Sequence, residues 1–163
     1  MAKTKNNKRK KRKKRTKKRV YSLKDYTSGD GMLTSVWGPS LWHYLHTMSF
    51  NYPVKPTALD KKKYKEFVLT LKYILPCKYC RINFKDNLKA IPLNGNALKN
   101  RKTFSKWMYC LHEHINKMLK KKSGLSYCDV RERYENFRAR CSMTDIKKRL
   151  NIKNKTKKEK GCV

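Results

Sequence analysis

The fold class of this chain is decided by one stretch of sequence, WGPSLWHYLHTMSFNYP at residues 37–53. Its large apolar side chains recur at steps of three and four residues between Trp37 and Tyr52. That spacing places them on one face of an α-helix, and Pro53 ends the helix because proline cannot continue it. The stretch therefore predicts an amphipathic helix with one face directed at a core.

Helical spacing recurs along the rest of the sequence. Further helices are predicted at residues 64–75, 77–88, 103–119 and 129–137, with Thr103 and Asp129 expected at helix starts. No stretch shows the alternation of apolar and polar residues that is typical of strands. The predicted fold class is all-α, a four-helix bundle plus a short fifth helix.

The two ends of the chain differ sharply in composition from the middle. Thirteen of the first nineteen residues and eight of the last eighteen are Lys or Arg, and the formal net charge is +33 for 163 residues. These blocks offer little apolar area to offset the loss of chain entropy on folding, so both are predicted to be disordered. We expect a basic N-terminal tail at residues 1–33, a helical domain at 34–143 and a basic C-terminal tail at 144–163.

Composition also limits where the protein acts. No apolar run approaches the roughly 18 to 20 residues that a membrane helix needs, and the basic start lacks the apolar core of a secretory signal. A transmembrane segment and secretion are therefore not expected. The basic tails favour non-specific contact with nucleic acid, nuclear localisation or contact with an anionic lipid surface. The alternative is a pair of solvated tails without a dedicated partner.

The sharpest chemical signal is the sequence CKYC at residues 77–80. Two cysteines with this spacing at a helix start can close a small disulfide ring. The helix N-terminus and the neighbouring basic side chains favour the reactive thiolate. The motif therefore predicts thiol–disulfide exchange. A purely structural bridge is one alternative, and another is a zinc site completed by Cys110, His112 or Cys128.

Histidine, asparagine and aromatic side chains recur on two of the predicted helices. Trp42 and His46 lie one turn apart, Tyr52 follows at the end of the same helix, and His112 and Asn116 lie one turn apart on a later one. On facing helices, such side chains suit a large planar polar cofactor better than a bare metal ion. Each residue taken singly is equally well explained as part of the core.

Four sequence blocks follow one another in a fixed order. They are the W-x-x-L-H-T-M run at residues 42–48 with Y-P at 52–53, P-C-K-Y-C at 76–80, W-M-Y-C-L-H-E-H-I-N at 107–116 and C-D-V-R-E-R-Y at 128–134. In this order they resemble the Erv/Alr family of FAD-linked sulfhydryl oxidases. The second block resembles the redox-active motif of that family, and the third resembles its flavin-binding motif.

The resemblance implies a helical bundle that holds FAD and is usually a homodimer. It implies that Cys77 and Cys80 form the catalytic pair, with Cys80 facing the flavin and Cys77 exchanging with substrate, and that no metal is needed. It also implies a structural disulfide between Cys110 and Cys128. The cofactor-binding residues that it implies are Gly38, Trp42, His46, Tyr52, Cys110, His112, Asn116, Arg133 and Tyr134.

The implied activity is oxidation of protein dithiols to disulfides, with oxygen as electron acceptor and hydrogen peroxide as product. An oxidase core with basic tails suggests a large DNA virus, which would place the protein in the host cytoplasm or the virion; a non-viral protein would be intracellular. Members of the family often carry a second, mobile cysteine pair. Here Cys162 is the candidate shuttle, with Cys141 or another subunit as its partner, and the alternative is a stray exposed thiol.

Two other functions remain open. Glu113 stands where the family has an asparagine beside its histidine, which favours a catalytically inactive scaffold that keeps the bundle. The second alternative is a basic protein that binds nucleic acid and holds zinc through its cysteines and histidines. It predicts bound metal and no flavin colour.

Overall fold

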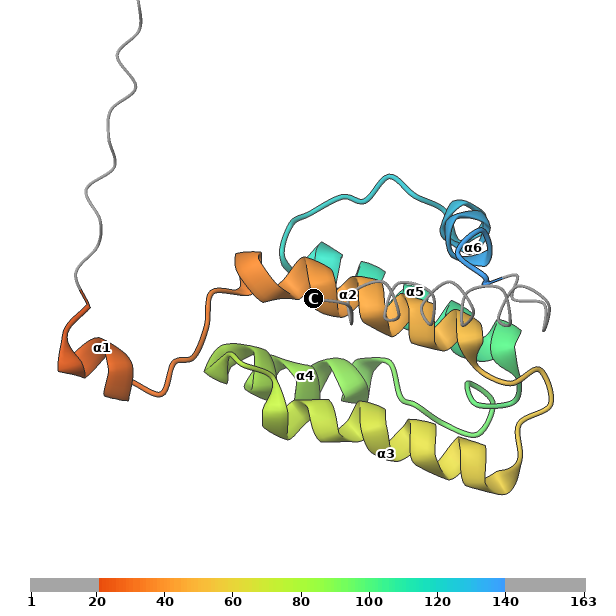
Figure 1. Ribbon diagram of the computed structural model, residues 1–163, viewed down its shortest axis with the longest axis horizontal. Helices are drawn as coiled ribbons and strands as arrows, with labels where there is room; N and C mark the ends of the chain where they lie inside the picture. The colour runs from red at the N-terminus through yellow and green to blue at the C-terminus, as the bar shows by residue number, and fades with distance from the viewer. Residues whose placement is uncertain (1–20, 140–163) are drawn as a thin grey trace, which may run out of the picture. The chain divides into compact units, whose positions relative to one another are not determined.

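The computed structural model describes residues 21–139, to which the structural statements below refer. This range holds six helices and no strand: α1 (Leu23–Thr27), α2 (Thr34–Asn51), α3 (Ala58–Ile74), α4 (Lys78–Ala90), α5 (Arg101–Met118) and α6 (Tyr127–Glu135) (Figure 1). Helix α1 belongs to a separate unit, and the other five helices belong to the unit that starts at Gly31. The predicted all-α fold class is confirmed. None of these helices is both long and apolar enough to span a membrane.

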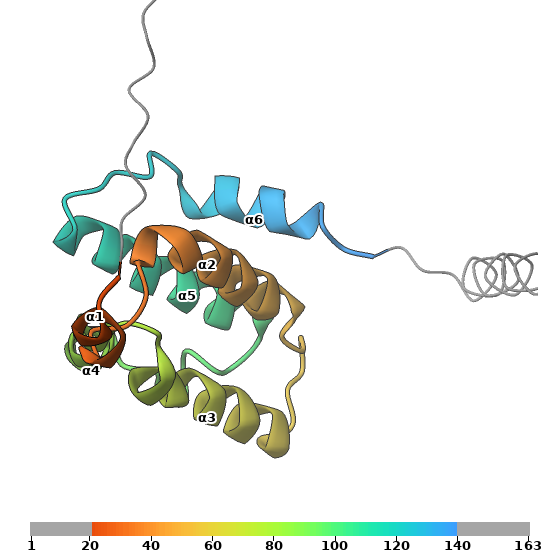
Figure 2. The same ribbon diagram turned by 60° about the vertical axis from the view of Figure 1, so that its left-hand side comes forward.

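The unit that starts at Gly31 is built from two helix pairs. Helix α2 packs along α5, α3 packs along α4, and α4 also touches α5. Figures 1 and 2 show α6 on the opposite side of the α2–α5 pair from α3 and α4, where it contacts both α2 and α5. The arrangement is the predicted bundle of four helices with a short additional helix.

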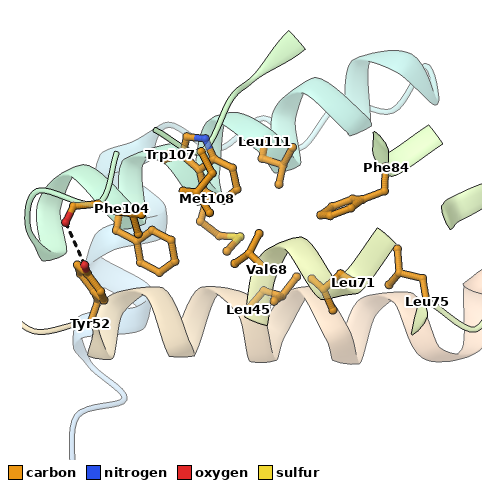
Figure 3. Packing of buried hydrophobic residues seen from close by; sticks show 12 residues of the cluster. Leu45, Tyr52, Val68, Leu71, Leu75, Phe84, Phe104, Trp107, Met108 and Leu111 are labelled. Carbon is orange, nitrogen blue, oxygen red and sulfur yellow. Dashed lines mark hydrogen bonds between the residues drawn. The ribbon is translucent and has the colours of Figure 1, made fainter. Parts of the chain in front are cut away.

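The hydrophobic core lies between the two helix pairs. Leu45 of α2, Val68 of α3, Phe84 of α4 and Met108 of α5 are all almost fully buried in it (Figure 3). Burial of a large apolar side chain contributes about 1.5–3 kcal/mol, so contacts of this kind hold the four helices in register. The core thereby fixes the relative positions of α2, α4 and α5, which carry the chemically active side chains.

The two residues expected at helix starts, Thr103 and Asp129, each lie one turn inside their helices. Asn100 caps α5 and Ser126 caps α6, whereas Thr103 and Asp129 are the third residues of these helices. The side chains of Thr103 and Asp129 accept hydrogen bonds from the backbone N–H groups of Asn100 and Ser126, at 3.1 and 2.7 Å. Each pair forms a capping box, in which both side chains are of a type that favours a helix start.

The described part of the predicted N-terminal tail is not wholly irregular. It contains α1, which Ser22 caps through a reciprocal pair of hydrogen bonds with Asp25. The capping box explains the short helix, because it satisfies backbone N–H groups that have no partner within the helix. The basic block before residue 21 and the predicted C-terminal tail at 144–163 lie outside the described residues.

Candidate active site

The two cysteines of the CKYC motif form a disulfide at the start of α4. Cys77 is the N-cap of the helix, and its Sγ accepts a hydrogen bond from the backbone N–H of Cys80 at 3.2 Å. A helix N-terminus carries partial positive charge, which stabilises thiolates formed there. The predicted disulfide ring is thus present, at a position that favours its reduced, ionised form.

A cavity of about 780 Å³ lies beside this disulfide. Cys77 and Cys80 both line it, together with side chains from all the helices of this unit. Much of the wall is apolar, with Leu45, Leu71 and Phe84 among the lining residues. A volume in this range is typical of sites for small molecules and cofactors.

The histidines predicted from the sequence meet in the wall of the cavity. His46 Nε2 and His112 Nδ1 lie 3.0 Å apart and share a hydrogen bond, and the indole ring of Trp42 stacks on His112 with 3.9 Å between ring centroids. Burial is the main cause that lowers the pKa of each imidazole to about 4. Both rings are therefore neutral at pH 7, and one donates to the other.

One polar atom of the site has no partner within the protein. His46 lines the cavity and is 4% exposed, and its Nδ1 is buried without a hydrogen bond. An unpartnered buried polar atom costs free energy, which a ligand in the cavity relieves if it supplies a polar group. The flat surface of Trp42 and this nitrogen fit a large planar polar cofactor such as FAD.

Helix α6 contributes Tyr134 to the same cavity. The ring of Tyr134 stacks on Phe50 with 5.6 Å between centroids, and it lies 5.2 Å from the ring of His46. Its hydroxyl shares a hydrogen bond with Nδ1 of His43 at 3.3 Å. Sequence reasoning missed His43, although its position three residues before His46 places both on one face of the helix.

Three of the predicted cofactor-binding residues do not line the cavity. Tyr52 lies in the core, fully buried, and its hydroxyl donates to the carbonyl of Leu98 at 3.0 Å (Figure 3). Six residues after His46, it lies about 240° around the helix from that side chain. Cys110 is partly buried on α5 and Arg133 is exposed on α6, and neither borders the cavity. The residues that the structure does bring together are Gly38, Trp42, His46, Cys77, Cys80, His112, Asn116 and Tyr134.

The predicted structural disulfide between Cys110 and Cys128 is not formed, because the structure has both as free thiols. The reason lies in the first turn of α6. Tyr127 turns inward there, with its hydroxyl 2.9 Å from Ser105 Oγ and its ring stacked on Phe50. Cys128 follows about 100° further around the helix and is exposed. Cys141 and the proposed shuttle Cys162 lie outside the described residues.

Glu113, which departs from the family pattern, does not border the cavity. Its Oε1 accepts a hydrogen bond from Nδ2 of Asn116 at 2.9 Å. One amide proton of Asn116 is therefore committed to the carboxylate, while Asn116 still lines the cavity. The substitution changes how Asn116 is held without placing a negative charge in the cavity wall.

No cluster of three or more metal-ligating side chains occurs within residues 21–139. The zinc site considered from the sequence needed Cys77 and Cys80 together with Cys110, His112 or Cys128. In the structure the first two are joined to each other, and the described residues offer no other group of ligands. The part of the chain that the structure describes therefore gives no support to the zinc alternative.

Fold and cavity together define an α-helical protein in which a disulfide of two closely spaced cysteines lies beside a cofactor-sized cavity, an arrangement suited to thiol–disulfide exchange. The sequence profile of the Erv1/Alr family matches residues 39–137, which is more than half of the chain. The chain belongs to the Erv1/Alr family. The predicted fold, FAD as cofactor and thiol oxidation are thus confirmed at the level of the family.

Relatives and solved structures agree with this assignment. A probable FAD-linked sulfhydryl oxidase of Acanthamoeba polyphaga mimivirus is 36% identical over 99 residues, which cover 61% of this chain and 68% of the viral protein. The FAD-linked sulfhydryl oxidase ERV1 of Arabidopsis thaliana is 33% identical over 99 residues, 61% of this chain and 50% of the plant protein. The chain thus spans half to two thirds of the length of these relatives.

The similarity extends to three dimensions. The crystal structure of the FAD-binding domain of Erv1 from Saccharomyces cerevisiae superimposes with a TM-score of 0.57 at 29% identity. The match covers 66% of this chain and 99% of the yeast domain. Nearly the whole yeast domain therefore has its counterpart in this chain.

Proposed function

We propose that this chain is an FAD-dependent sulfhydryl oxidase. It converts protein dithiols to disulfides, with oxygen as the final electron acceptor and hydrogen peroxide as product. The observation that carries the proposal is the Cys77–Cys80 disulfide in the wall of a cavity that fits a flavin. FAD held there would supply the two-electron chemistry that connects the reduced cysteine pair to oxygen.

The residues that would hold the cofactor come from three helices. Trp42 and Tyr134 offer aromatic faces, and the unpartnered Nδ1 of His46 offers a hydrogen bond. His112 keeps the orientation of His46 through their shared hydrogen bond, and Asn116 retains one free amide proton. Gly38 borders the cavity without adding a side chain to it.

The chain's own chemical contribution is thiol–disulfide exchange. A substrate thiolate attacks Sγ of Cys77 and forms a mixed disulfide, and Cys80 leaves as a thiolate. A second substrate thiolate then attacks the substrate sulfur of the mixed disulfide, so that the substrate disulfide forms and Cys77 leaves as a thiolate. The N-terminus of α4 stabilises both leaving groups.

Assembly and location form part of the same proposal. Tyr44, Leu59 and Phe67 are exposed on α2 and α3, and they supply apolar area for a homodimer. The similarity to a mimivirus protein supports a viral origin, with the host cytoplasm or the virion as location. Contact with nucleic acid through the basic tails rests on their charge. Electron relay through Cys162 stays a prediction.

The visible absorption spectrum of the purified chain, supplied with FAD, tests the function. We expect a flavin absorption band that bleaches when dithiothreitol is added in limited oxygen and returns in air. A flavin band that dithiothreitol leaves unchanged would instead identify an inactive scaffold. A colourless protein that retains zinc would contradict the proposal and favour the basic metal-binding alternative.

A further inference from the structure

Residues 31–33, here called the strap, precede the region that matches the family profile and yet touch the redox centre. Gly31 forms an isolated antiparallel β-bridge with Cys77, and the N–H of Met32 donates to the carbonyl of Pro76 at 2.6 Å. The indole N–H of Trp37 donates to the carbonyl of Met32 at 3.1 Å. The strap is therefore held from both sides, and it fixes the start of α2 against the disulfide.

Thr34, the first residue of α2, follows the strap and faces the second cysteine. Its Oγ1 lies 3.6 Å from Sγ of Cys80, within hydrogen-bonding distance for sulfur. A disulfide sulfur carries no proton, so the hydroxyl is the donor. A Cβ at Gly38 would lie 3.2 Å from the methyl group of Thr34. The glycine therefore leaves room for the methyl group while the hydroxyl contacts the sulfur.

The two sulfurs of the disulfide have different hydrogen-bond donors. Cys77 Sγ accepts from the backbone of α4, through the N–H of Cys80. Cys80 Sγ faces the hydroxyl of Thr34, which belongs to α2. A hydrogen bond to an ionised sulfur is stronger than one to a neutral sulfur. The hydrogen bond from the Thr34 hydroxyl therefore becomes stronger when the disulfide opens and Cys80 becomes a thiolate.

We propose that Thr34 is a catalytic residue, whose hydroxyl stabilises the Cys80 thiolate released when a substrate thiolate opens the disulfide. This role in turnover rests on the proposed function. In the step, a bond forms between the substrate sulfur and Cys77, and the Cys77–Cys80 bond breaks. Its electron pair remains on Cys80 Sγ, and Thr34 donates a hydrogen bond without transferring its proton. A better-stabilised thiolate is a better leaving group.

The cavity and α4 also carry charged groups that the proposal has to separate from this hydroxyl. Lys121 lines the same cavity, and Lys78 and Arg81 lie on α4 itself. The guanidinium of Arg81 donates to the carbonyl of Leu75 at 2.6 Å. The imidazoles of His46 and His112, which also line the cavity, are neutral at pH 7. A change confined to the hydroxyl of Thr34 leaves all these groups in place, so it isolates the contribution of the hydroxyl.

The test compares Thr34→Val, which keeps the shape and loses the hydroxyl, with Thr34→Ser, which keeps the hydroxyl. Each full-length, FAD-loaded variant is equilibrated without oxygen in dithiothreitol buffers at mildly alkaline pH. Thiol trapping and mass spectrometry of the peptide that contains Cys77 and Cys80 report the fraction reduced. We expect Thr34→Val to shift the equilibrium about tenfold toward the disulfide, equivalent to about 30 mV for a two-electron couple. Thr34→Ser should remain close to wild type.

The opposing outcomes are distinct. Equal equilibria for wild type and Thr34→Val, or equal shifts for Thr34→Val and Thr34→Ser, would overturn this inference. If Thr34→Val does not fold, Thr34→Ala provides a second variant without the hydroxyl, with the same expected shift. A wild-type chain that neither binds FAD nor oxidises thiols would overturn the proposed function, and the catalytic role of Thr34 with it. An unchanged equilibrium in an active oxidase would overturn the role of Thr34 alone.

Discussion

At the scale of single residues, the site depends on the different surroundings of two identical side chains. Cys77 belongs to the backbone turn that starts α4, and Cys80 contacts a hydroxyl from another helix. In the proposed mechanism Cys80 passes electrons to the cofactor and Cys77 meets the substrate, so the two thiols need different environments. The structure provides this difference across only three residues of sequence.

Replacing Cys80 by serine separates cofactor binding from turnover. We expect Cys80→Ser to bind FAD like the wild type, because the aromatic and histidine side chains of the cavity remain. Oxidation of dithiothreitol should be abolished, since no disulfide can form with Cys77. Flavin absorbance and peroxide release measure the two properties. The matched control is Cys128→Ser, which removes an exposed free thiol outside the cavity and should keep full activity. Substantial turnover by Cys80→Ser would contradict the assigned roles.

At the scale of helices, periodic spacing predicted the elements well and their first residues poorly. The apolar positions of α2, α3 and α5 must repeat with the helical period to form a core, so they are visible in the sequence. Thr103 and Asp129 resemble N-caps because the third residue of a capping box has the same polar character as the cap. Helix α1 was missed because it has only five residues and buries none of them, so it is too short for a periodic pattern to be visible.

The candidate site was predictable to a similar degree. His46 and His112 could be found because helical spacing places them on particular faces, and the spacing of Cys77 and Cys80 is itself a chemical signal. The structure places Tyr52 away from the cavity and leaves Cys110 and Cys128 unpaired, and these placements depend on how helices are rotated against one another, which spacing does not reveal. Thr34 carries no local motif. Its relevance appears only in three dimensions, where the strap holds the first residue of α2 beside the disulfide at the start of α4.

The close approach of the strap to Pro76 leads to a prediction for a substitution at Gly31. Gly31 has a φ of +89°, and a Cβ there would lie 2.6 Å from the carbonyl oxygen of Pro76. Gly31→Ala should therefore displace the strap and lower the free energy of unfolding by about 1–3 kcal/mol. The Cys77–Cys80 disulfide should also be reduced faster by dithiothreitol. Urea unfolding and reduction kinetics measure the two effects.

The control for the strap is Gly124→Ala. Gly124 shares the positive φ, at +68°, but a Cβ there would meet no atom within 4 Å. Gly124→Ala therefore introduces backbone strain without a collision. It should be less destabilising than Gly31→Ala and should leave the rate at which dithiothreitol reduces the disulfide unchanged. Equal effects of the two substitutions on the reduction rate would show that the strap does not control access to the disulfide.

At the scale of the whole molecule, the neutral histidine pair couples folding to pH. The folded-state pKa of His46 and of His112 is about 4, below the ordinary value of 6.5 that applies to the unfolded chain. Between these values the unfolded state binds more protons than the folded state. Their contribution to stability is therefore complete above pH 6.5 and is lost as the pH falls toward 4.

We expect the free energy of unfolding to decrease as the pH falls from 6.5 to 4, with each histidine contributing a slope of at most about 1.4 kcal/mol per pH step of one. Urea unfolding at several pH values measures this slope. His46→Leu should make the dependence of the unfolding free energy on pH less steep. His114→Gln, on α5 and outside the cavity, should leave it as in wild type. An unchanged slope in His46→Leu would show that the buried pair does not cause the acid sensitivity.

The β-bridge between Gly31 and Cys77 also determines where the preceding chain is attached. Arg19, the last residue of the basic block, is twelve residues before Gly31 and so stays within about 43 Å of it, whatever path the chain follows. The basic block is thus a tether whose fixed end is the redox centre. If the block binds an acidic thiol protein, the local concentration of that protein at the disulfide would depend on the length of this connection as well as on its abundance in solution.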